Sequence, residues 1–206
     1  MKIIEKTNTL QNILDAGKTE FMEKGFKSAS LRSIVKNAGV TTGAFYGYFS
    51  SKEDLFDALV KEPADFFMSE YKKVQYDFKK LSPIQQEEGV GKISGNWMEW
   101  IIDYIYDHFD AFRLIISCSE GTRYEDFIHE MVEVEVEATH DFISVMKSQG
   151  KEIRHIDPQL EHILVSGLFA AFFEVVIHDM PRSQAKEYIR DLREFQTAGW
   201  MKIMGL

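Results

Sequence analysis

Small, hydroxyl-bearing and basic side chains gather in one short segment near the N-terminus of this 206-residue chain. Residues 30–52 read SLRSIVKNAGVTTGAFYGYFSSK. The short side chains of Thr41, Thr42 and Ala44 would let a helix backbone approach base edges in a DNA major groove. The tyrosine hydroxyls and the lysine ammonium that follow are groups that bind phosphate oxygens. The DNA-contacting residues that this segment predicts are Arg32, Thr41, Thr42, Gly43, Ala44, Tyr46, Tyr48 and Lys52.

Two helices are needed to position these side chains, and the sequence contains signals for both. Ser30 is a favourable N-cap for a helix over residues 31–38, which a glycine then ends. Thr41 caps a short second helix that runs to about Phe49, and Phe45 lies four residues earlier on the same face, where both rings can pack on a small core. The pattern is typical of a helix-turn-helix. The alternative is a three-helix bundle with buried tyrosines, which would not need small or polar residues at the start of the second helix.

Charge is distributed unevenly along the chain. The 33 acidic and 24 basic side chains give a net charge of −9 at pH 7, which by itself argues against a nucleic-acid partner because phosphate binding requires clustered Lys and Arg. Residues 1–52, however, carry eight basic and four acidic side chains, a net charge of +4, and residues 53–206 carry −13. A basic head on an acidic body is consistent with two regions that meet different partners.

Helical periodicity extends over nearly the whole chain, so the predicted fold class is all-α with about nine helices. The expected helices cover residues 9–24, 31–38, 41–49, 52–80, 83–109, 111–117, 124–146, 158–179 and 182–204. One segment is ambiguous, because residues 131–137 alternate apolar and acidic residues as a strand does. Over the wider window 124–145 the apolar residues keep steps of three and four, which favours a helix.

Residues 9–60 resemble the DNA-binding domain of the TetR family of transcriptional regulators. The residues that match the family pattern are Ala38-Gly39-Val40, Gly43, Phe45-Tyr46, Tyr48-Phe49, Lys52 and Leu55. The resemblance implies an N-terminal three-helix helix-turn-helix domain at residues 1–52 and a larger helical ligand-binding and dimerisation domain at residues 53–206. It also implies a ligand-responsive homodimeric regulator, a repressor that binds a palindromic double-stranded DNA operator and is released by a small apolar or aromatic effector.

Aromatic residues concentrate at residues 93–112, where the family encloses a small-molecule pocket between its middle helices. An aromatic stripe at helical spacing is also typical of an ordinary core. The residues that we expect to line such a pocket are Trp97, Trp100, Tyr104, Phe127, Met131 and Phe169. They favour an apolar or aromatic ligand, with Asp103, His108 or Glu174 as its polar anchor.

The segment 160–177 is apolar nearly all the way round, and such a helix must be covered on both sides. The resemblance implies that the last two helices, at about 158–179 and 182–204, form a two-fold four-helix interface between two copies of the chain. Periodicity alone indicates only that these helices require burial, which an intramolecular core would also provide.

Two features of the sequence point to functions other than a DNA-binding regulator. Asp126 with His129 and Glu137 with His140 resemble the carboxylate–histidine pairs of di-iron bundles, but they lie eleven residues apart on one predicted helix, about 16 Å at 1.5 Å per residue. They cannot share one metal centre, so the sequence predicts no enzyme activity, no cofactor and no metal. Thr42 and Gly47 depart from the family pattern, which often has lysine and a longer side chain there. These departures allow a small-molecule-binding or protein-interaction module with weakened specific DNA binding.

Composition also bears on where the protein acts. A single cysteine, Cys118, cannot form an intrachain disulfide. The N-terminal residues contain no apolar run typical of a signal peptide, and the most apolar stretch, 164–177, is shorter than a bilayer span. The sequence therefore predicts a cytoplasmic protein with no membrane partner.

Overall fold

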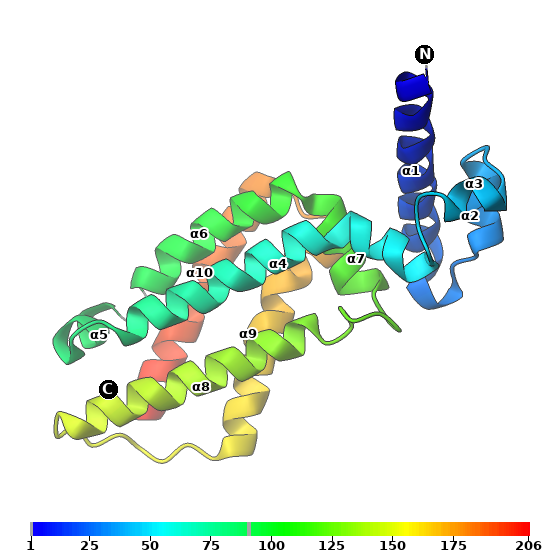
Figure 1. Cartoon of the computed structure of the whole chain (residues 1–206). Coiled ribbons are helices and arrows are strands. Elements are labelled where there is room, and N and C mark those ends of the chain that lie inside the picture. Colours follow the sequence, from blue (N-terminus) through cyan, green and yellow to red (C-terminus); the bar gives the residue numbers. More distant parts are fainter. Residues whose placement is uncertain (1, 90–91) are drawn as a thin grey trace. The chain divides into compact units, whose positions relative to one another are not determined.

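The structure, a computed structural model, describes residues 2–89 and 92–206, and within these ranges it contains ten α-helices and no strand (Figure 1). The helices are α1 (Lys2–Ser28), α2 (Leu31–Asn37), α3 (Thr42–Tyr46), α4 (Lys52–Lys79), α5 (Pro83–Gly89), α6 (Lys92–Asp107), α7 (Phe109–Cys118), α8 (Phe127–Ser148), α9 (Pro158–Ile177) and α10 (Arg182–Met204). The all-α prediction is confirmed. The predicted helix over 83–109 is instead divided into α5 and α6, and residues 90–91 of that prediction lie outside the described ranges.

The chain packs as two compact units. The first unit comprises Met1–Asp65 and Phe109–Glu125, and the second comprises Phe66–His108 and Asp126–Leu206. The boundary predicted from sequence lies between residues 52 and 53, whereas this division falls within α4, so that the two halves of one helix serve different units. α7 belongs to the first unit because it packs against α1.

Phenylalanine rings form the centre of the first unit. Phe21, Phe26 and Phe56 contact one another, with ring centroids 5.2–5.7 Å apart. α1 and α4 approach each other closely at Gly17, where a Cβ atom would lie 2.6 Å from Cδ2 of the buried Leu55. Glycine removes this collision and thereby permits the close approach of the two helices.

Aliphatic side chains dominate the buried stripe of α6 in the second unit. Ile101, Ile102 and Ile105 are completely buried, and α6 packs against α10 while α8 and α10 both pack against α9. The ambiguous segment 131–137 lies within α8, so the prediction of a helix is confirmed. Met131 and Val132 face the core while Glu133 is exposed, which shows that the helical period governs this segment.

α9 begins with an Asp N-cap followed by a proline in its first turn. The Asp157 carboxylate accepts hydrogen bonds from the backbone N–H groups of Gln159 at 3.0 Å and Leu160 at 3.1 Å, and Pro158 occupies the first turn. With a mean hydropathy of 1.9, α9 is long and apolar enough to cross a bilayer by length and composition alone. The core helix of a folded domain satisfies the same criterion, and Val165, Phe173 and Val176 of α9 are buried in the second unit.

Candidate nucleic-acid interface and ligand cavity

Local hydrogen bonds define both helices of the helix-turn-helix. The Ser30 hydroxyl accepts a hydrogen bond from the backbone N–H of Ser33 at 3.4 Å, and the Thr41 hydroxyl accepts one from that of Ala44 at 3.1 Å. Each residue therefore caps the helix that follows it. Gly39 lies in the turn with φ of 67°, a left-handed conformation that favours glycine.

Buried apolar side chains hold α2 and α3 together on their inner faces. Ile34 and Phe45 are completely buried, and Val35 is nearly so. The ring of Phe49 packs 5.8 Å from that of Phe45, centroid to centroid. α3 contains five residues and Gly47 is its C-cap rather than a position inside the helix, so Gly47 does not impose the cost that a glycine has in a helix interior.

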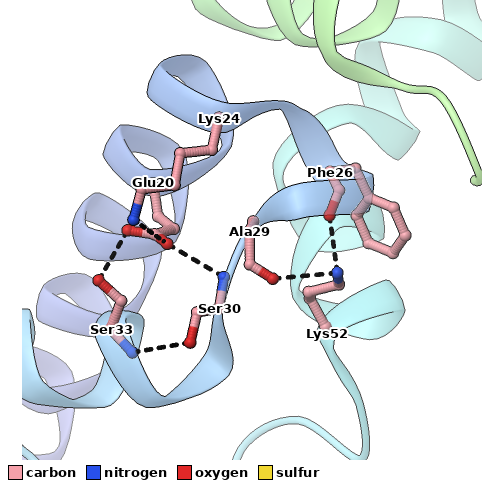
Figure 2. A network of polar contacts seen from close by, with 7 residues as sticks. All are labelled: Glu20, Lys24, Phe26, Ala29, Ser30, Ser33 and Lys52. Carbon is pink, nitrogen blue, oxygen red and sulfur yellow. Dashed lines mark hydrogen bonds and ion pairs between the residues drawn. The ribbon is translucent and has the colours of Figure 1, made fainter.

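A buried carboxylate connects α1 to the start of α2 (Figure 2). Glu20, only 2% exposed, accepts hydrogen bonds from the backbone N–H of Ser30 at 3.0 Å and the hydroxyl of Ser33 at 2.8 Å. The Lys24 ammonium donates a third at 2.7 Å. Burial acts to raise the pKa of Glu20, but these donors outweigh it and hold the pKa below its ordinary value. The completed cluster fixes the N-terminus of α2 against α1.

Lys52, at the start of α4, also serves this framework (Figure 2). Its ammonium donates to the backbone carbonyls of Phe26 at 2.7 Å and Ala29 at 3.2 Å. The same nitrogen lies 4.3 Å from the centroid of the Phe26 ring, within the range of a cation–π interaction. An ammonium has three N–H donors. Two of those on Lys52 are used by backbone carbonyls at the C-terminal end of α1 and are therefore not directed to an outside partner.

The remaining predicted DNA-contacting residues divide by exposure. The exposed ones are Arg32, Thr41, Thr42, Gly43 and Tyr46. Ala44, Tyr48 and Lys52 are half-buried. Tyr46 leaves 55% of its surface exposed while Phe45, its neighbour in α3, is completely buried. α3 thus presents small and hydroxyl-bearing residues outward and packs an aromatic side chain inward.

A cavity of about 180 Å³ lies within the second unit. Its walls come mainly from α4, α6, α8, α9 and α10, and most lining side chains are apolar or aromatic, including Tyr71, Phe78, Trp97, Phe142, Phe169 and Trp200. Glu135 and Arg193 are the charged residues in the described lining. Concave, mostly apolar cavities with a few polar groups are typical of small-molecule sites.

The Glu135 side chain, half-buried, is held by two neutral donors. Its Oε2 atom accepts hydrogen bonds from the Tyr71 hydroxyl at 2.5 Å and the Gln75 amide at 2.6 Å. Among the side chains that the structure describes, no Lys, Arg or His nitrogen forms an ion pair with it. Burial raises the pKa of Glu135 above its ordinary value, since the two donors offset only part of the cost of enclosing the charge. Burial and this carboxylate also raise the pKa of Tyr71 well above its usual value.

Sequence reasoning missed Glu135, although a signal was present. Met131, Glu135, Ala138 and Phe142 follow helical steps of four, three and four, so the glutamate falls on the apolar face of α8. A charged residue on an apolar helical face is unusual enough to indicate a buried partner or a ligand.

Of the six residues predicted to line the pocket, two line the cavity and four lie elsewhere. Trp97 and Phe169 line the cavity, and the Trp97 indole N–H is buried without a hydrogen-bond partner among the described residues. Trp100, Tyr104, Phe127 and Met131 lie outside its lining. Trp100, 43% exposed, and Tyr104 instead stack on each other beside Phe66, because isoleucines rather than aromatics form the buried stripe of α6. Phe127 and Met131 are buried in the core, where Phe127 packs on Phe67 and Phe173.

The polar anchors expected from sequence also lie outside the cavity lining. Asp103 is engaged by Arg182 at 2.8 Å and Lys186 at 2.8 Å. His108 is exposed and packs against Tyr104, and Glu174 pairs with His178 at 2.8 Å. Within residues 2–89 and 92–206, the structure contains no group of three or more His, Cys, Asp or Glu side chains that could hold a metal ion.

Comparison with known proteins identifies the first unit most clearly. The family described as "Bacterial regulatory proteins, tetR family" matches residues 13–59, which include α2, α3 and the start of α4. The regulator AcrR of Shigella flexneri is 46% identical over 55 residues, which are 27% of this chain and 26% of that protein. UidR of Escherichia coli K12 is 23% identical over 177 residues, 85% of this chain and 83% of that regulator.

Solved structures share the fold over more than nine-tenths of the chain. FadR from Bacillus subtilis, solved in complex with stearoyl-CoA, has a TM-score of 0.55 at 16% identity and covers 92% of this chain and 98% of its own. GusR from Salmonella enterica has a TM-score of 0.51 at 16% identity and covers 96% of each chain. Together with the capped helix-turn-helix, the family match identifies residues 13–59 as a segment of the TetR family of bacterial regulatory proteins, and the longer chain is similar in sequence to the regulator UidR and in fold to FadR and GusR.

Proposed function

We propose that this regulator is a homodimeric repressor that binds a palindromic operator and is released when a small molecule occupies the cavity of its second unit. The observation that carries the proposal is the two-sided character of α3. Its buried face anchors the helix through Phe45, while its outer face offers Thr42, Gly43 and Tyr46. A short helix with small residues outward can approach base edges in a major groove.

Positive charge in the N-terminal region supports binding to DNA. Arg32 and Lys36 are exposed on α2, where they can contact the phosphate backbone next to α3. Lys52 supports the interface in a different way, by holding the end of α1 in place through two backbone carbonyls. The strongly acidic remainder of the chain is repelled by DNA, which directs contact to the helix-turn-helix.

Exposed apolar side chains on the last two helices support a homodimer. On α9, Ile163 is 65% exposed and Leu160 and Ile177 are also exposed, and on α10 Phe195 is 74% exposed. Large apolar side chains at this exposure on neighbouring helices are typical of a protein–protein interface. A symmetric pairing of α9 and α10 with their copies would cover them, and two DNA-binding units would then meet two half-sites.

The cavity supports control by a small molecule. The related fold of Bacillus subtilis FadR was solved with stearoyl-CoA, and the cavity in this chain has the apolar walls that suit an apolar or aromatic effector. An effector releases DNA only if it binds more tightly to a conformer with low operator affinity. No step of this function requires catalysis, and we expect it to take place in the cytoplasm, where the chromosome is accessible.

Footprinting of genomic fragments with the purified full chain tests the proposal. We expect protection of a palindromic sequence whose half-sites are spaced by about one helical turn, 10–10.5 base pairs, or a multiple of it. Sedimentation analysis is expected to give a dimer, and Phe195→Glu together with Ile163→Glu is expected to give a monomer with much weaker operator binding. Salt-dependent binding with no protected sequence would instead favour a module that no longer reads specific DNA.

A further inference from the structure

The Glu135 carboxylate lines the cavity without a positively charged partner among the described side chains. Both of its hydrogen bonds, from Tyr71 and Gln75, are accepted by Oε2 and come from neutral groups. No cationic side chain among the described residues lies within 4.0 Å of the carboxylate. Even partial burial of a carboxylate without a cation is costly, so a position on an apolar helical face has no structural advantage for a glutamate. A ligand that brings a positive charge would supply what the fold lacks.

The walls around Glu135 favour a cation over an anion. Tyr71, which donates to Glu135, packs against the rings of Trp97 at 5.3 Å and Phe169 at 5.8 Å between centroids. Aromatic faces carry negative electrostatic potential and attract cations. Arg193 also lines the cavity, but it forms no ion pair with Glu135 among the described contacts. It is therefore a competing site for an anion, and the experiment must test it directly.

The volume of the cavity suits a ligand with one ring. At about 180 Å³, it is slightly larger than cavities of about 150 Å³ that hold a benzene molecule. The additional space suits a short aliphatic arm. The apolar lining beside Trp97, Phe169 and Leu168 suits the ring, and Glu135 suits the group at the end of the arm.

We propose that this cavity binds a small aromatic amine, whose protonated nitrogen pairs with the Glu135 carboxylate while its single ring lies against Trp97 and Phe169. The inference rests on the proposed function only in making this amine the effector that releases DNA. Binding of the amine to the second unit stands independently of whether the first unit reads an operator.

Calorimetric titration of the full-length protein with three matched probes tests the inference. 2-Phenylethylamine carries the cation, 2-phenylethanol is neutral and 3-phenylpropionate is an anion on a similar skeleton. We expect the amine to bind tightest. Glu135→Gln is expected to weaken amine binding about ten- to a hundred-fold, the range of a charge-assisted hydrogen bond, and to leave binding of the alcohol nearly unchanged. The glutamine retains a carbonyl that can accept from Tyr71 and Gln75, so the variant is expected to fold.

Two further variants separate a specific ion pair from the general negative charge of the chain. Glu137→Gln removes the same charge from an exposed position on α8, and it is expected to leave amine affinity unchanged. Arg193→Gln removes the like charge from the lining and is expected to strengthen amine binding slightly. A circular-dichroism melt of each variant verifies that it is folded.

Three results would overturn the inference: no binding of the amine at millimolar concentration, equal weakening by Glu137→Gln, or tightest binding of 3-phenylpropionate through Arg193. Addition of 2-phenylethylamine to the complex with the footprinted DNA then tests the proposed function separately. If the amine binds through Glu135 and operator affinity does not change, the ligand assignment holds and its role as the effector fails. If no operator exists, the calorimetric result still decides the ligand.

Discussion

Glu20 in the first unit and Glu135 in the second are both glutamates that turn inward, yet their pKa values move in opposite directions. Glu20 receives three hydrogen bonds, one of them from the Lys24 ammonium, and its pKa is lowered. Glu135 receives two, both from neutral groups, and its pKa is raised. Burial acts against the charge in both places, so the partners decide the outcome. A completed cluster holds a fold together, whereas an incomplete one at a cavity leaves a position for a ligand.

The two units should respond separately to the largest disruption, Phe45→Ala. Phe45 is completely buried beneath α3, and removing such a ring costs about 3–5 kcal/mol of stability. We expect operator binding to be lost, as measured by gel shift, while calorimetric binding of a ligand to the cavity persists. Tyr76→Ala, at an aromatic of α4 that is 58% exposed and lies outside the proposed dimer helices, serves as the control for stability and should change the free energy of unfolding little. Loss of ligand binding in Phe45→Ala would show that the units do not fold independently.

Glu20→Gln tests the completed cluster. Loss of the charged acceptor from Lys24, Ser30 and Ser33 is expected to cost about 1–3 kcal/mol in the free energy of unfolding. Because the pKa of Glu20 is lower in the folded state, the wild-type contribution is fully present above the unfolded pKa of about 4.3 and is lost as pH falls through the folded pKa. Denaturant titrations from pH 7 to pH 3 should therefore show that the difference in free energy of unfolding between wild type and variant decreases as the pH falls. Glu23→Gln, exposed on α1, should show no such gap.

Glu135→Gln should have the opposite effect on stability from Glu20→Gln. Because the pKa of Glu135 is raised in the folded state, deprotonation of this group destabilises the wild type as pH rises through that pKa. Without ligand, we expect the variant to be more stable than the wild type by on the order of 1 kcal/mol near pH 8, and the difference to vanish at low pH. The titratable and charged groups that share the cavity are Tyr71 and Arg193. Melting temperatures across pH, with and without Arg193→Gln, measure the effect; destabilisation near pH 8 would mean that Glu135 is already fully compensated.

Lys52→Met is expected to have the smallest effect and distinguishes two roles for this lysine. If Lys52 acts by holding the carbonyls of Phe26 and Ala29, its loss should lower stability by about 1 kcal/mol and leave the salt dependence of operator binding unchanged. If Lys52 instead neutralised a phosphate, the slope of log affinity against log salt would fall by about one. Lys36→Met, on the exposed face of α2, provides the comparison, since it is expected to change that slope.

The helix-turn-helix was predictable because its determinants are local. Ser30 and Thr41 cap their helices through atoms three residues away, and the turn glycine at position 39 adopts the left-handed conformation that its residue type favours. Such contacts are encoded within one helical turn. The role of Lys52 was not predictable in the same way, since its partners lie 23 and 26 residues earlier in the chain.

The cavity was predictable only in part. Trp97 and Phe169 line it, whereas Trp100 and Tyr104 pack on the surface beside Phe66. Aromatic spacing within α6 could not decide between these positions, because the face that a helix buries depends on which neighbours pack against it. Glu135 was not predicted because it is one of three glutamates that alternate with apolar residues at 131–137. This alternation does not indicate which of the three carboxylates faces the interior.

The sequence by itself determined the helical class, the caps and turn of the DNA-binding motif, and the separation of a basic head from an acidic body, because each depends on residue type and on contacts within a few positions. The tertiary structure alone decided where α4 passes from one unit to the other, which aromatic residues enclose the cavity, and which glutamates are paired. These features depend on contacts between residues far apart in the chain. Such contacts exist only once the helices have packed.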